Sequence, residues 1–218
     1  MNYSFSEENY LKAIFHLQEK QGKVSTSALA AQLKTKPSSI TDMMKKLAAK
    51  DLLLYKPYYG FSLSAEGKRI ALNVIRRHRL WEYFLAEKLQ FGWDEVHQVA
   101  EELEHISNKK LVEKLDAYLG FPQFDPHGDP IPDSLGKITQ IDQVLLSELP
   151  LNQKAVITSV ANHSTELLEA LNEKKIAIGT EVELKKRFEF DGSLHAKIKN
   201  KTLTLTDNLA KNIYVKKL

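Results

Sequence analysis

The segment HQVAEELEH, residues 97–105, carries two histidines, three glutamates and no lysine. A solvated helical face usually balances its glutamates with lysines, so this composition raises the question of a metal site. At about 100° per residue, four of these side chains fall within an arc of roughly 100° on an α-helix. The segment therefore predicts either half of a metal site or an acidic surface. The four side chains are His97, Glu101, Glu104 and His105, whereas Glu102 points away.

A second histidine–glutamate pair lies earlier in the chain, in RRHRLWEYF. His78 and Glu82 are four residues apart and therefore share one face of a helix. Imidazole suits first-row transition metals, and carboxylates balance the charge of a divalent ion. Taken singly, each such pair is more often a surface ion pair than a set of metal ligands. Two pairs on neighbouring acidic helices leave both interpretations open on chemistry alone.

The net charge of +3 hides two regions of opposite sign. Residues 34–79 contain 11 basic and 3 acidic side chains, whereas residues 82–133 contain 4 basic and 12 acidic ones. The first region is suited to face a polyanion such as DNA. The second is suited to hold divalent cations.

The composition also excludes several classes of protein. The chain has no cysteine, which excludes disulfides, thiol catalysis and thiolate metal sites. No apolar run approaches the length needed to span a bilayer, and the amino terminus lacks the pattern of an export signal. We therefore expect a cytoplasmic protein with no membrane partner. Because there is no HExxH motif, nucleophile elbow or phosphate loop, we expect neither an enzyme nor a small-molecule substrate.

The amino-terminal part of the chain predicts a winged helix-turn-helix. Residues 6–20 predict a helix with Ser6 as its N-cap, and two more helices follow at 25–33 and from Pro37. The runs LLLYK and GFSLS, joined by PYYG, predict a β-hairpin. In such a domain the third helix lies in the major groove, although the hairpin tyrosines could serve only to stabilise the hairpin. The expected DNA contacts are Thr35, Lys36, Pro37, Ser38, Ser39, Thr41 and Lys45, with Lys56, Tyr58 and Tyr59 at the hairpin tip.

The rest of the chain predicts a helical segment followed by a small β-barrel. A long helix is expected over 64–89, and shorter helices over 93–107 and 108–119. Residues 121–133 hold four of the seven prolines and predict a loop. Beyond them, short β-like runs surround one helix at 163–174.

The run HRLWEYF…WDEVHQVAEELEHIS…LGFPQFDPHGDPIP resembles the diphtheria toxin repressor family of metal-dependent transcription regulators, which includes a manganese-sensing branch. The resemblance covers the whole chain, and its core motif is highly specific because residue types, spacing and domain order agree. It implies a mainly α protein of three domains. They are a winged helix-turn-helix DNA-binding domain at 1–63, a helical dimerisation and metal-binding domain at 64–136 and an SH3-like (FeoA-like) β-barrel domain at 137–218.

The same resemblance implies two metal sites. Oxygen donors stand at two positions where the iron-sensing branch has methionine and cysteine, which favours Mn(II) or Fe(II) over softer ions. Lys12 departs from the manganese branch, which has an acidic residue there, and this weakens the case for an adjacent pair of ions. By position in this sequence, the implied ligands are His78, Glu82 and His97 in one site, and Asn9, Glu101, Glu104 and His105 in the other.

The carboxy-terminal domain supplies ligands in some members of the family. His163 and Glu166 are the residues that would do so here. Asp125, His127 and Asp129 also look like a ligand cluster, but DPHGDPIP resembles the turn that follows the family's dimerisation helices. We interpret these three residues as structural.

The function implied by the resemblance is metal-dependent repression. A homodimer loaded with Mn(II) or Fe(II) would bind a pseudo-palindromic operator in double-stranded DNA and control genes of metal homeostasis. Two other interpretations remain open. One is a winged-helix regulator that responds to a non-metal ligand, and the other is a dinuclear metalloenzyme built on the same histidines and glutamates.

Overall fold

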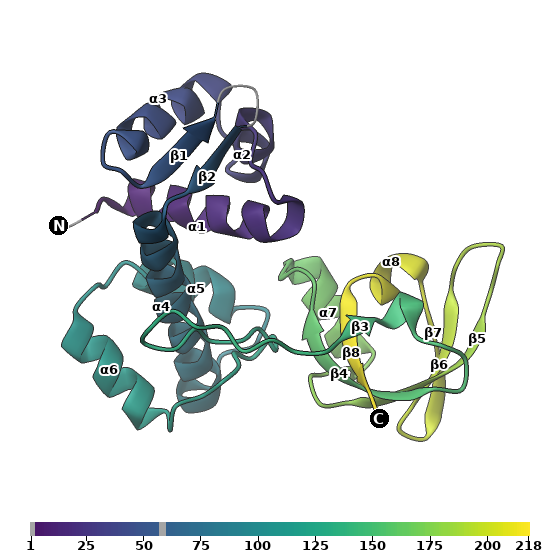
Figure 1. Ribbon diagram of the computed structural model, residues 1–218. Coiled ribbons are helices and arrows are strands. Elements are labelled where there is room, and N and C mark those ends of the chain that lie inside the picture. The colour runs from purple at the N-terminus through teal and green to yellow at the C-terminus, as the bar shows by residue number, and fades with distance from the viewer. Residues whose placement is uncertain (1–2, 57–59) are drawn as a thin grey trace. The chain divides into compact units, whose positions relative to one another are not determined.

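The computed structural model describes residues 3–56 and 60–218 (Figure 1). The chain forms two compact units, each assembled from separate segments. The first comprises Met1–His78, Leu103–Val112 and Pro132–Lys137, and the second comprises Arg79–Glu102, Glu113–Ile131 and Ile138–Leu218. Within the described ranges, no helix is both long and apolar enough to cross a membrane.

The first unit contains the predicted winged helix-turn-helix. Its two strands pair antiparallel, with Leu53 opposite Leu63. The core is formed by side chains with no exposed surface, among them Leu11, Ile14 and Ile40. The elements are α1 (Phe5–Gln21), α2 (Thr26–Gln32), α3 (Pro37–Ala48), β1 (Leu53–Lys56), β2 (Gly60–Leu63) and the first part of α4 (Ala65–Leu89).

Helix α1 begins at Phe5, so the predicted N-cap, Ser6, is wrong and Ser4 takes that role. The hydroxyl of Ser4 accepts a hydrogen bond from the Glu7 amide, and the Glu7 carboxylate accepts one from the Ser4 amide. This reciprocal capping box requires Glu or Gln three residues after the cap. Ser4 meets that requirement, whereas the third residue after Ser6 is Asn9.

The second unit contains the rest of α4 and most of two shorter helices, α5 (Val96–Leu103) and α6 (Lys109–Tyr118). Both are shorter than predicted, because 93–95 form a turn and 104–108 leave the helical path. Helix α5 buries Val96 and Ala100. This leaves its polar residues, including His97 and Glu101, on the other face.

The carboxy-terminal part of the second unit is a six-stranded antiparallel sheet. Its order is β3-β8-β4-β5-β6-β7. Leu168 and Leu171 of the helix between β4 and β5 belong to the same buried cluster as the sheet residues. The elements are β3 (Val144–Leu145), the 3-10 helix η1 (Leu146–Glu148), β4 (Lys154–Val160), α7 (Thr165–Glu173), β5 (Glu181–Arg187), β6 (Leu194–Ile198), β7 (Lys201–Leu205), α8 (Asp207–Ala210) and β8 (Ile213–Lys217).

The loop that follows α6 lies tightly against β4. The carbonyl of His127 accepts a hydrogen bond from the Val160 amide at 3.3 Å. Gly128 has φ +84°, and a Cβ atom there would lie 1.8 Å from the carbonyl oxygen of Thr158. Both the positive φ and the close approach of backbone require glycine. The loop is thereby pinned next to the carboxy-terminal end of β4.

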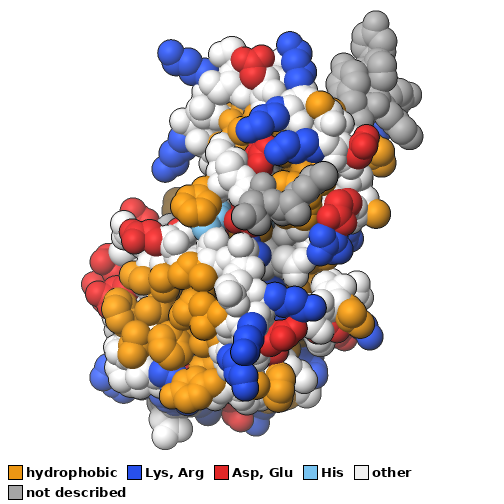
Figure 2. All heavy atoms as spheres, turned by 90° about the vertical axis from the view of Figure 1, so that its left-hand side faces the viewer, with side chains coloured by type: hydrophobic (Ala, Val, Ile, Leu, Met, Phe, Trp, Pro, Cys, Tyr) orange, Lys and Arg blue, Asp and Glu red, His pale blue; other side chains and the backbone are white. Residues whose placement is uncertain are grey.

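The second unit also exposes large apolar side chains near the carboxyl ends of α4 and α6. Tyr118 and Phe121 are each 67% exposed, and Leu89 is 52% exposed. Nζ of Lys88 lies 5.8 Å from the centre of the Tyr118 ring, so the two helix ends are neighbours. Figure 2 shows hydrophobic side chains gathered on one face of the molecule. Exposed apolar surface of this kind marks an interaction site.

Candidate metal centre

A buried carboxylate meets an imidazole between α4 and α5 in the second unit. Oε1 of Glu82 lies 3.0 Å from Nδ1 of His97. The Glu82 side chain is fully buried, whereas that of His97 is 40% exposed. A buried carboxylate is costly unless charge or hydrogen bonds compensate for lost water. The groups around Glu82 therefore decide what this site can hold.

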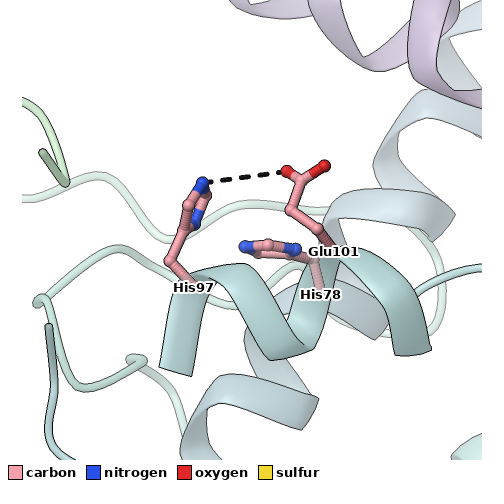
Figure 3. A group of neighbouring side chains, drawn as sticks. All are labelled: His78, His97 and Glu101. Atoms are coloured by element: carbon pink, nitrogen blue, oxygen red, sulfur yellow. Dashed lines mark ion pairs between the residues drawn. The ribbon is translucent and has the colours of Figure 1, made fainter. Parts of the chain in front are cut away.

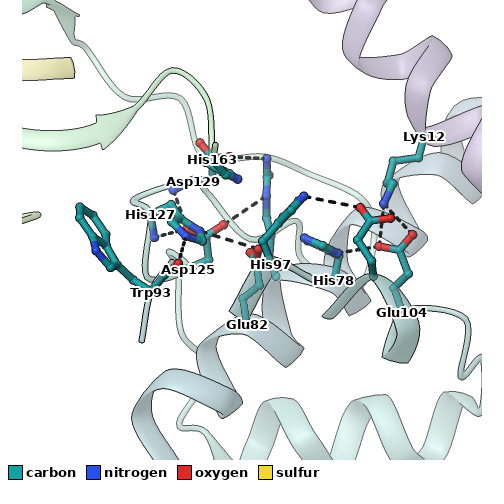
Figure 4. Close-up of polar contacts among 12 residues, drawn as sticks. Lys12, His78, Glu82, Trp93, His97, Glu104, Asp125, His127, Asp129 and His163 are labelled. Atoms are coloured by element: carbon teal, nitrogen blue, oxygen red, sulfur yellow. Dashed lines mark hydrogen bonds and ion pairs between the residues drawn. The ribbon is translucent and has the colours of Figure 1, made fainter. Parts of the chain in front are cut away.

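His163 joins this pair from a distant part of the sequence, just before α7 (Figure 4). Ligand-capable atoms of Glu82, His97 and His163 all lie within 4.8 Å of one another. Burial, with a contribution from the charge of His127, lowers the pKa of His163 to about 3. Its imidazole is therefore neutral at neutral pH and offers a lone pair to a metal ion.

Glu101 lies on α5 and His78 lies on α4, the two helices that also carry His97 and Glu82. Glu101 follows His97 by one turn of α5, and its Oε1 lies 3.7 Å from Nε2 of His97. Figure 3 shows this ion pair together with His78 of α4. His78 precedes Glu82 by one turn of α4, so both side chains project from the same face of that helix.

His127, in the loop after α6, is a further imidazole next to Glu82. Its side chain is fully buried, and its ring stacks on that of His163 with centroids 4.1 Å apart. Nε2 donates a hydrogen bond to the carbonyl oxygen of Trp93 at 2.7 Å, and Nδ1 lies 3.7 Å from Oε1 of Glu82. Burial alone would lower the pKa of His127, but the nearby carboxylates of Glu82 and Asp125 outweigh it and raise that pKa.

Asp125 forms the turn that the sequence predicts. Its Oδ1 accepts hydrogen bonds from the amides of His127 and Asp129, at 2.8 and 3.0 Å. Its Oδ2 lies 3.6 Å from Nε of Arg79. Burial, reinforced by the charges of Glu82 and Asp129, raises the pKa of Asp125 well above its usual range. Glu82, Asp125 and His127 also present ligand-capable atoms within 4.8 Å of one another. The sequence marks Asp125 and His127 as a possible ligand cluster, but it does not indicate their approach to Glu82.

A separate polar cluster surrounds Glu104 in the first unit (Figure 4). Nζ of Lys12 lies 2.6 Å from Oε1 and 2.7 Å from Oε2 of this fully buried carboxylate. Nδ1 of His78 lies 2.6 Å from Oε2. Burial opposes ionisation of Glu104, but His78 and Lys12 outweigh it and lower the pKa. The chain's own ammonium group thus already balances this carboxylate.

Glu8 belongs to this cluster, although sequence reasoning does not single it out. Its Oε1 accepts a hydrogen bond from Nη2 of Arg77 at 2.8 Å, and its Oε2 lies 2.6 Å from Nδ1 of His105. The His105 ring also stacks on Phe5, with centroids 4.4 Å apart. The sequence gives one indication of this role: Glu8 precedes Lys12 by one turn of α1, so the two side chains share a helical face.

The other two expected ligands have contrasting surroundings. Oδ1 of Asn9 is buried and, among the residues that the structure describes, has no hydrogen-bond partner. An ion or a water molecule can satisfy a buried acceptor of this kind. Glu166 is exposed in the first turn of α7, and no group of potential ligands within the described part of the chain includes it.

The second unit has the donor set that a divalent first-row cation requires. A buried carboxylate supplies charge, and a neutral imidazole supplies a nitrogen lone pair. The Glu104 cluster fits less well, because Lys12 contacts both carboxylate oxygens and Arg77 contacts Glu8. Of the expected ligands Asn9, Glu101, Glu104 and His105, only Asn9 has a buried side-chain oxygen that lacks a hydrogen bond within residues 3–56 and 60–218.

The residues expected to contact DNA lie at the start of α3 and just before it. Thr35 is half-buried, and the others that the structure describes are exposed. Thr41 donates a hydrogen bond to the carbonyl of Pro37 at 3.1 Å, which keeps its hydroxyl against the helix. Tyr58, Tyr59 and the side chain of Lys56 lie outside the described part of the chain. The exposed residues are Lys36, Pro37, Ser38, Ser39, Thr41 and Lys45.

Three family models match consecutive parts of the chain. The N-terminal DNA-binding domain of iron-dependent repressors matches residues 3–61, and the metal-binding and dimerisation domain of the same repressors matches residues 64–133. The FeoA domain matches residues 144–217. Their order agrees with the fold described above.

Relatives and solved structures agree with these matches. The diphtheria toxin repressor of Corynebacterium glutamicum is 27% identical, over 97% of this chain and 96% of its own. The HTH-type transcriptional regulator MntR of Bacillus subtilis is 36% identical, over 50% of this chain and 77% of its own. A solved manganese-dependent transcriptional repressor in complex with manganese is 34% identical with a TM-score of 0.89, covering 97% of this chain and 100% of that one. These proteins are transcriptional regulators rather than enzymes, and the chain belongs to the diphtheria toxin repressor family of metal-dependent transcriptional repressors.

Proposed function

We propose that this chain forms a homodimer that binds operator DNA when Mn(II) or Fe(II) occupies its metal centre, and that it represses genes of metal homeostasis. The observation that carries the proposal is the convergence of buried Glu82 with His97 and His163. Carboxylate oxygen and imidazole nitrogen form a donor set suited to Mn(II) and Fe(II). The solved manganese-dependent repressor, at 34% identity over nearly the whole chain, supports the same choice of ions.

In this proposal Glu82, His97 and His163 hold the ion, and His78 adds a nitrogen from the preceding turn of α4. When bound, the ion supplies two positive charges beside a buried carboxylate. The residues arrive from α4, α5 and the segment before α7, so a common ligand links three segments of the second unit. The other proposed ligands, which belong to the second position, are Asn9, Glu101, Glu104 and His105, with Glu166 as a marginal candidate.

The proposed division of labour follows the three matched regions. Residues 1–63 contact DNA, 64–136 hold metal and dimerise, and 137–218 supply His163. Exposed hydroxyls and lysines at the start of α3 are suited to phosphates and base edges in a major groove. The proposed contacts are Thr35, Lys36, Pro37, Ser38, Ser39, Thr41 and Lys45, with Lys56, Tyr58 and Tyr59 from the hairpin tip.

The proposed dimer uses the exposed apolar side chains near the ends of α4 and α6. Tyr118, Phe121 and Leu89 are too large and too exposed to be explained by packing within one chain. A twofold dimer presents two winged helices to two half-sites of a pseudo-palindrome. If metal and DNA favour the same arrangement of the dimer, each tightens the binding of the other by the same factor.

The test is DNA binding as a function of metal concentration, under reducing conditions. A fluorescent duplex, selected in vitro for binding to the manganese-loaded protein, is titrated with the wild type in the presence of Mn(II) or a chelator. Binding is expected with Mn(II) and absent with the chelator. Glu82→Gln should lose the response, whereas His195→Ala, which changes a histidine of β6, should keep it. Equal affinity in Mn(II) and chelator would overturn the proposal.

A further inference from the structure

Trp93 lies in the turn before α5 and contacts the carboxy-terminal part of the second unit in two ways. Its side chain is half-buried and packs against the apolar cluster of the sheet, to which Leu168 and Leu171 of α7 belong. Its Nε1–H donates a hydrogen bond of 2.7 Å to Oδ1 of Asn172, in the last turn of α7. A tryptophan suits this position because it combines a large apolar ring with one hydrogen-bond donor.

Trp93 also supports His163, at the opposite end of α7. The Trp93 carbonyl accepts a hydrogen bond from Nε2 of His127 at 2.7 Å, and the two rings are inclined by 19° with centroids 6.1 Å apart (Figure 4). The His127 ring is in turn inclined by 18° to that of His163, with centroids 4.1 Å apart. His163 comes just before Ser164, the N-cap of α7. Trp93 therefore contacts one end of α7 directly and supports the other end through the His127 ring.

The same tryptophan is close in sequence to a second proposed ligand. It precedes His97 by four residues, and the rings of His97 and His163 have centroids 5.5 Å apart. Because these two ligands come from distant parts of the chain, their spacing depends on contacts between the two segments. The contacts of Trp93 join the segment that carries His97 to the helix that follows His163. Ligands held in place before binding lose less conformational freedom when the ion arrives.

We propose that Trp93 is a positioning residue of the metal centre, which holds α7 so that His163 stands beside Glu82 and His97 before an ion binds. This inference rests on the proposed function, because it takes His163 as a ligand. Trp93 offers no ligand atom itself, since the indole nitrogen is only a donor. Its removal should therefore lower the affinity for Mn(II) only in a chain that has His163.

The test is a double-mutant cycle on the full-length protein, with Mn(II) affinity measured by titration calorimetry. Trp93→Ala should weaken Mn(II) binding about tenfold, because His163 is no longer held in place. In a chain that already carries His163→Ala, the same substitution should change the affinity by less than about twofold. Equal losses in both backgrounds would overturn the inference, because Trp93 would then act independently of His163. Phe190→Ala removes a fully exposed aromatic ring and is the matched control.

Two milder variants keep the inference testable if Trp93→Ala fails to fold. Trp93→Phe keeps an aromatic ring but removes the donor, and Asn172→Ala removes the acceptor. Each should weaken Mn(II) binding about threefold, as expected for the loss of one hydrogen bond. The double variant should lose no more than either single one, because both substitutions remove the same bond. Wild-type affinity in both single variants, or losses that add in the double variant, would overturn the inference.

Hydrogen exchange of the metal-free protein gives a readout that does not depend on the ion. The amides of α7 should exchange at least about tenfold faster in Trp93→Ala than in the wild type, whereas those of α3 should not change. Unchanged exchange in α7 would overturn the inference. A wild-type protein that binds no Mn(II) would overturn the proposed function and this inference together, whereas equal losses in both backgrounds of a chain that binds Mn(II) overturn the inference alone.

Discussion

Nζ of Lys12 lies 2.6 Å from one carboxylate oxygen of Glu104 and 2.7 Å from the other, although the two residues are 92 positions apart in sequence. The lysine is 13% exposed and the carboxylate fully buried. An ammonium group thus stands where relatives of the manganese branch are expected to carry an acidic residue. The consequence is that a metal ion reaching Glu104 must compete with a cation that is part of the chain.

Removing that cation should therefore make the Glu104 cluster a better metal site. Lys12→Met is expected to raise its affinity for Mn(II) at least about tenfold, because one positive charge a few ångströms away is lost. The variant should also be less stable without metal, since a buried carboxylate loses its partner. Titration calorimetry measures the first effect and thermal unfolding with and without Mn(II) the second. Lys12→Arg keeps the charge and serves as the control; equal affinities in the three proteins would contradict the argument.

The capping box of α1 predicts a specific pH dependence of stability. Burial opposes ionisation of Glu7, but hydrogen bonds from Lys50, Ser4 and Lys46 outweigh it and lower the pKa from 4.5 to about 2. A depressed pKa in the folded state stabilises it above pH 4.5, and this stability is lost as the pH falls towards about 2. Glu7→Gln should cost about 1 kcal/mol at neutral pH.

That cost should shrink as the wild-type carboxylate becomes protonated. Urea unfolding of wild type and Glu7→Gln, measured at neutral pH and again near the folded-state pKa of about 2, checks the prediction. Glu19→Gln changes an exposed residue of the same helix and should have little effect at either pH. A difference between wild type and Glu7→Gln that stays constant with pH would argue against an ionised, hydrogen-bonded Glu7.

His163→Ala tests whether the carboxy-terminal domain contributes a ligand. Loss of one neutral imidazole from a site of three or four donors should weaken Mn(II) binding by about 10- to 100-fold. The fold should remain, because the sheet core does not include this residue. Titration calorimetry gives the affinity and circular dichroism the fold. His195→Ala again provides the control, and wild-type affinity in His163→Ala would remove this residue from the centre.

Ser39→Glu tests the placement of the DNA-reading helix. A carboxylate on this exposed position of α3 should repel DNA phosphates and weaken operator binding by about tenfold or more. The Mn(II) affinity of the free protein should not change. Fluorescence anisotropy with the selected duplex measures the first quantity. Thr202→Glu adds the same charge on exposed β7, and a similar loss in both variants would indicate a general charge effect instead.

The exposed aromatic residues after α6 should support the dimer. Phe121→Asp introduces a charge into the proposed interface and should shift the protein to monomer in sedimentation velocity experiments, because buried charge without a partner is costly. Phe190→Asp is the matched control, since Phe190 is fully exposed in a turn of the sheet region. A dimer of unchanged stability in Phe121→Asp would place the interface elsewhere.

Local pattern was sufficient to predict the winged helix and the histidine–glutamate pairs. Helical spacing puts His78 above Glu82 without any knowledge of the rest of the chain. Contacts between distant segments could not be predicted in the same way. The salt bridge from Lys12 to Glu104 depends on packing of segments that no periodicity relates.

The same limit applies to the loop after α6. Its turn chemistry was evident from the sequence, because an aspartate that binds the amides two and four residues later is a local feature. The approach of His127 to Glu82 was not evident, since it depends on how the loop packs against β4. Asp125 completes a local turn, which the sequence predicts. The position of its carboxylate next to Glu82 depends on the folded structure.

The contact between Gly128 and Thr158 limits how this gene can vary. With 1.8 Å between a Cβ atom and a carbonyl oxygen, even alanine would force the loop away from the strand beneath it. His127 is the adjacent residue, so its imidazole would be carried off together with the backbone. Substitution of Gly128 would therefore disturb the metal centre, although Gly128 itself contributes no side chain to it.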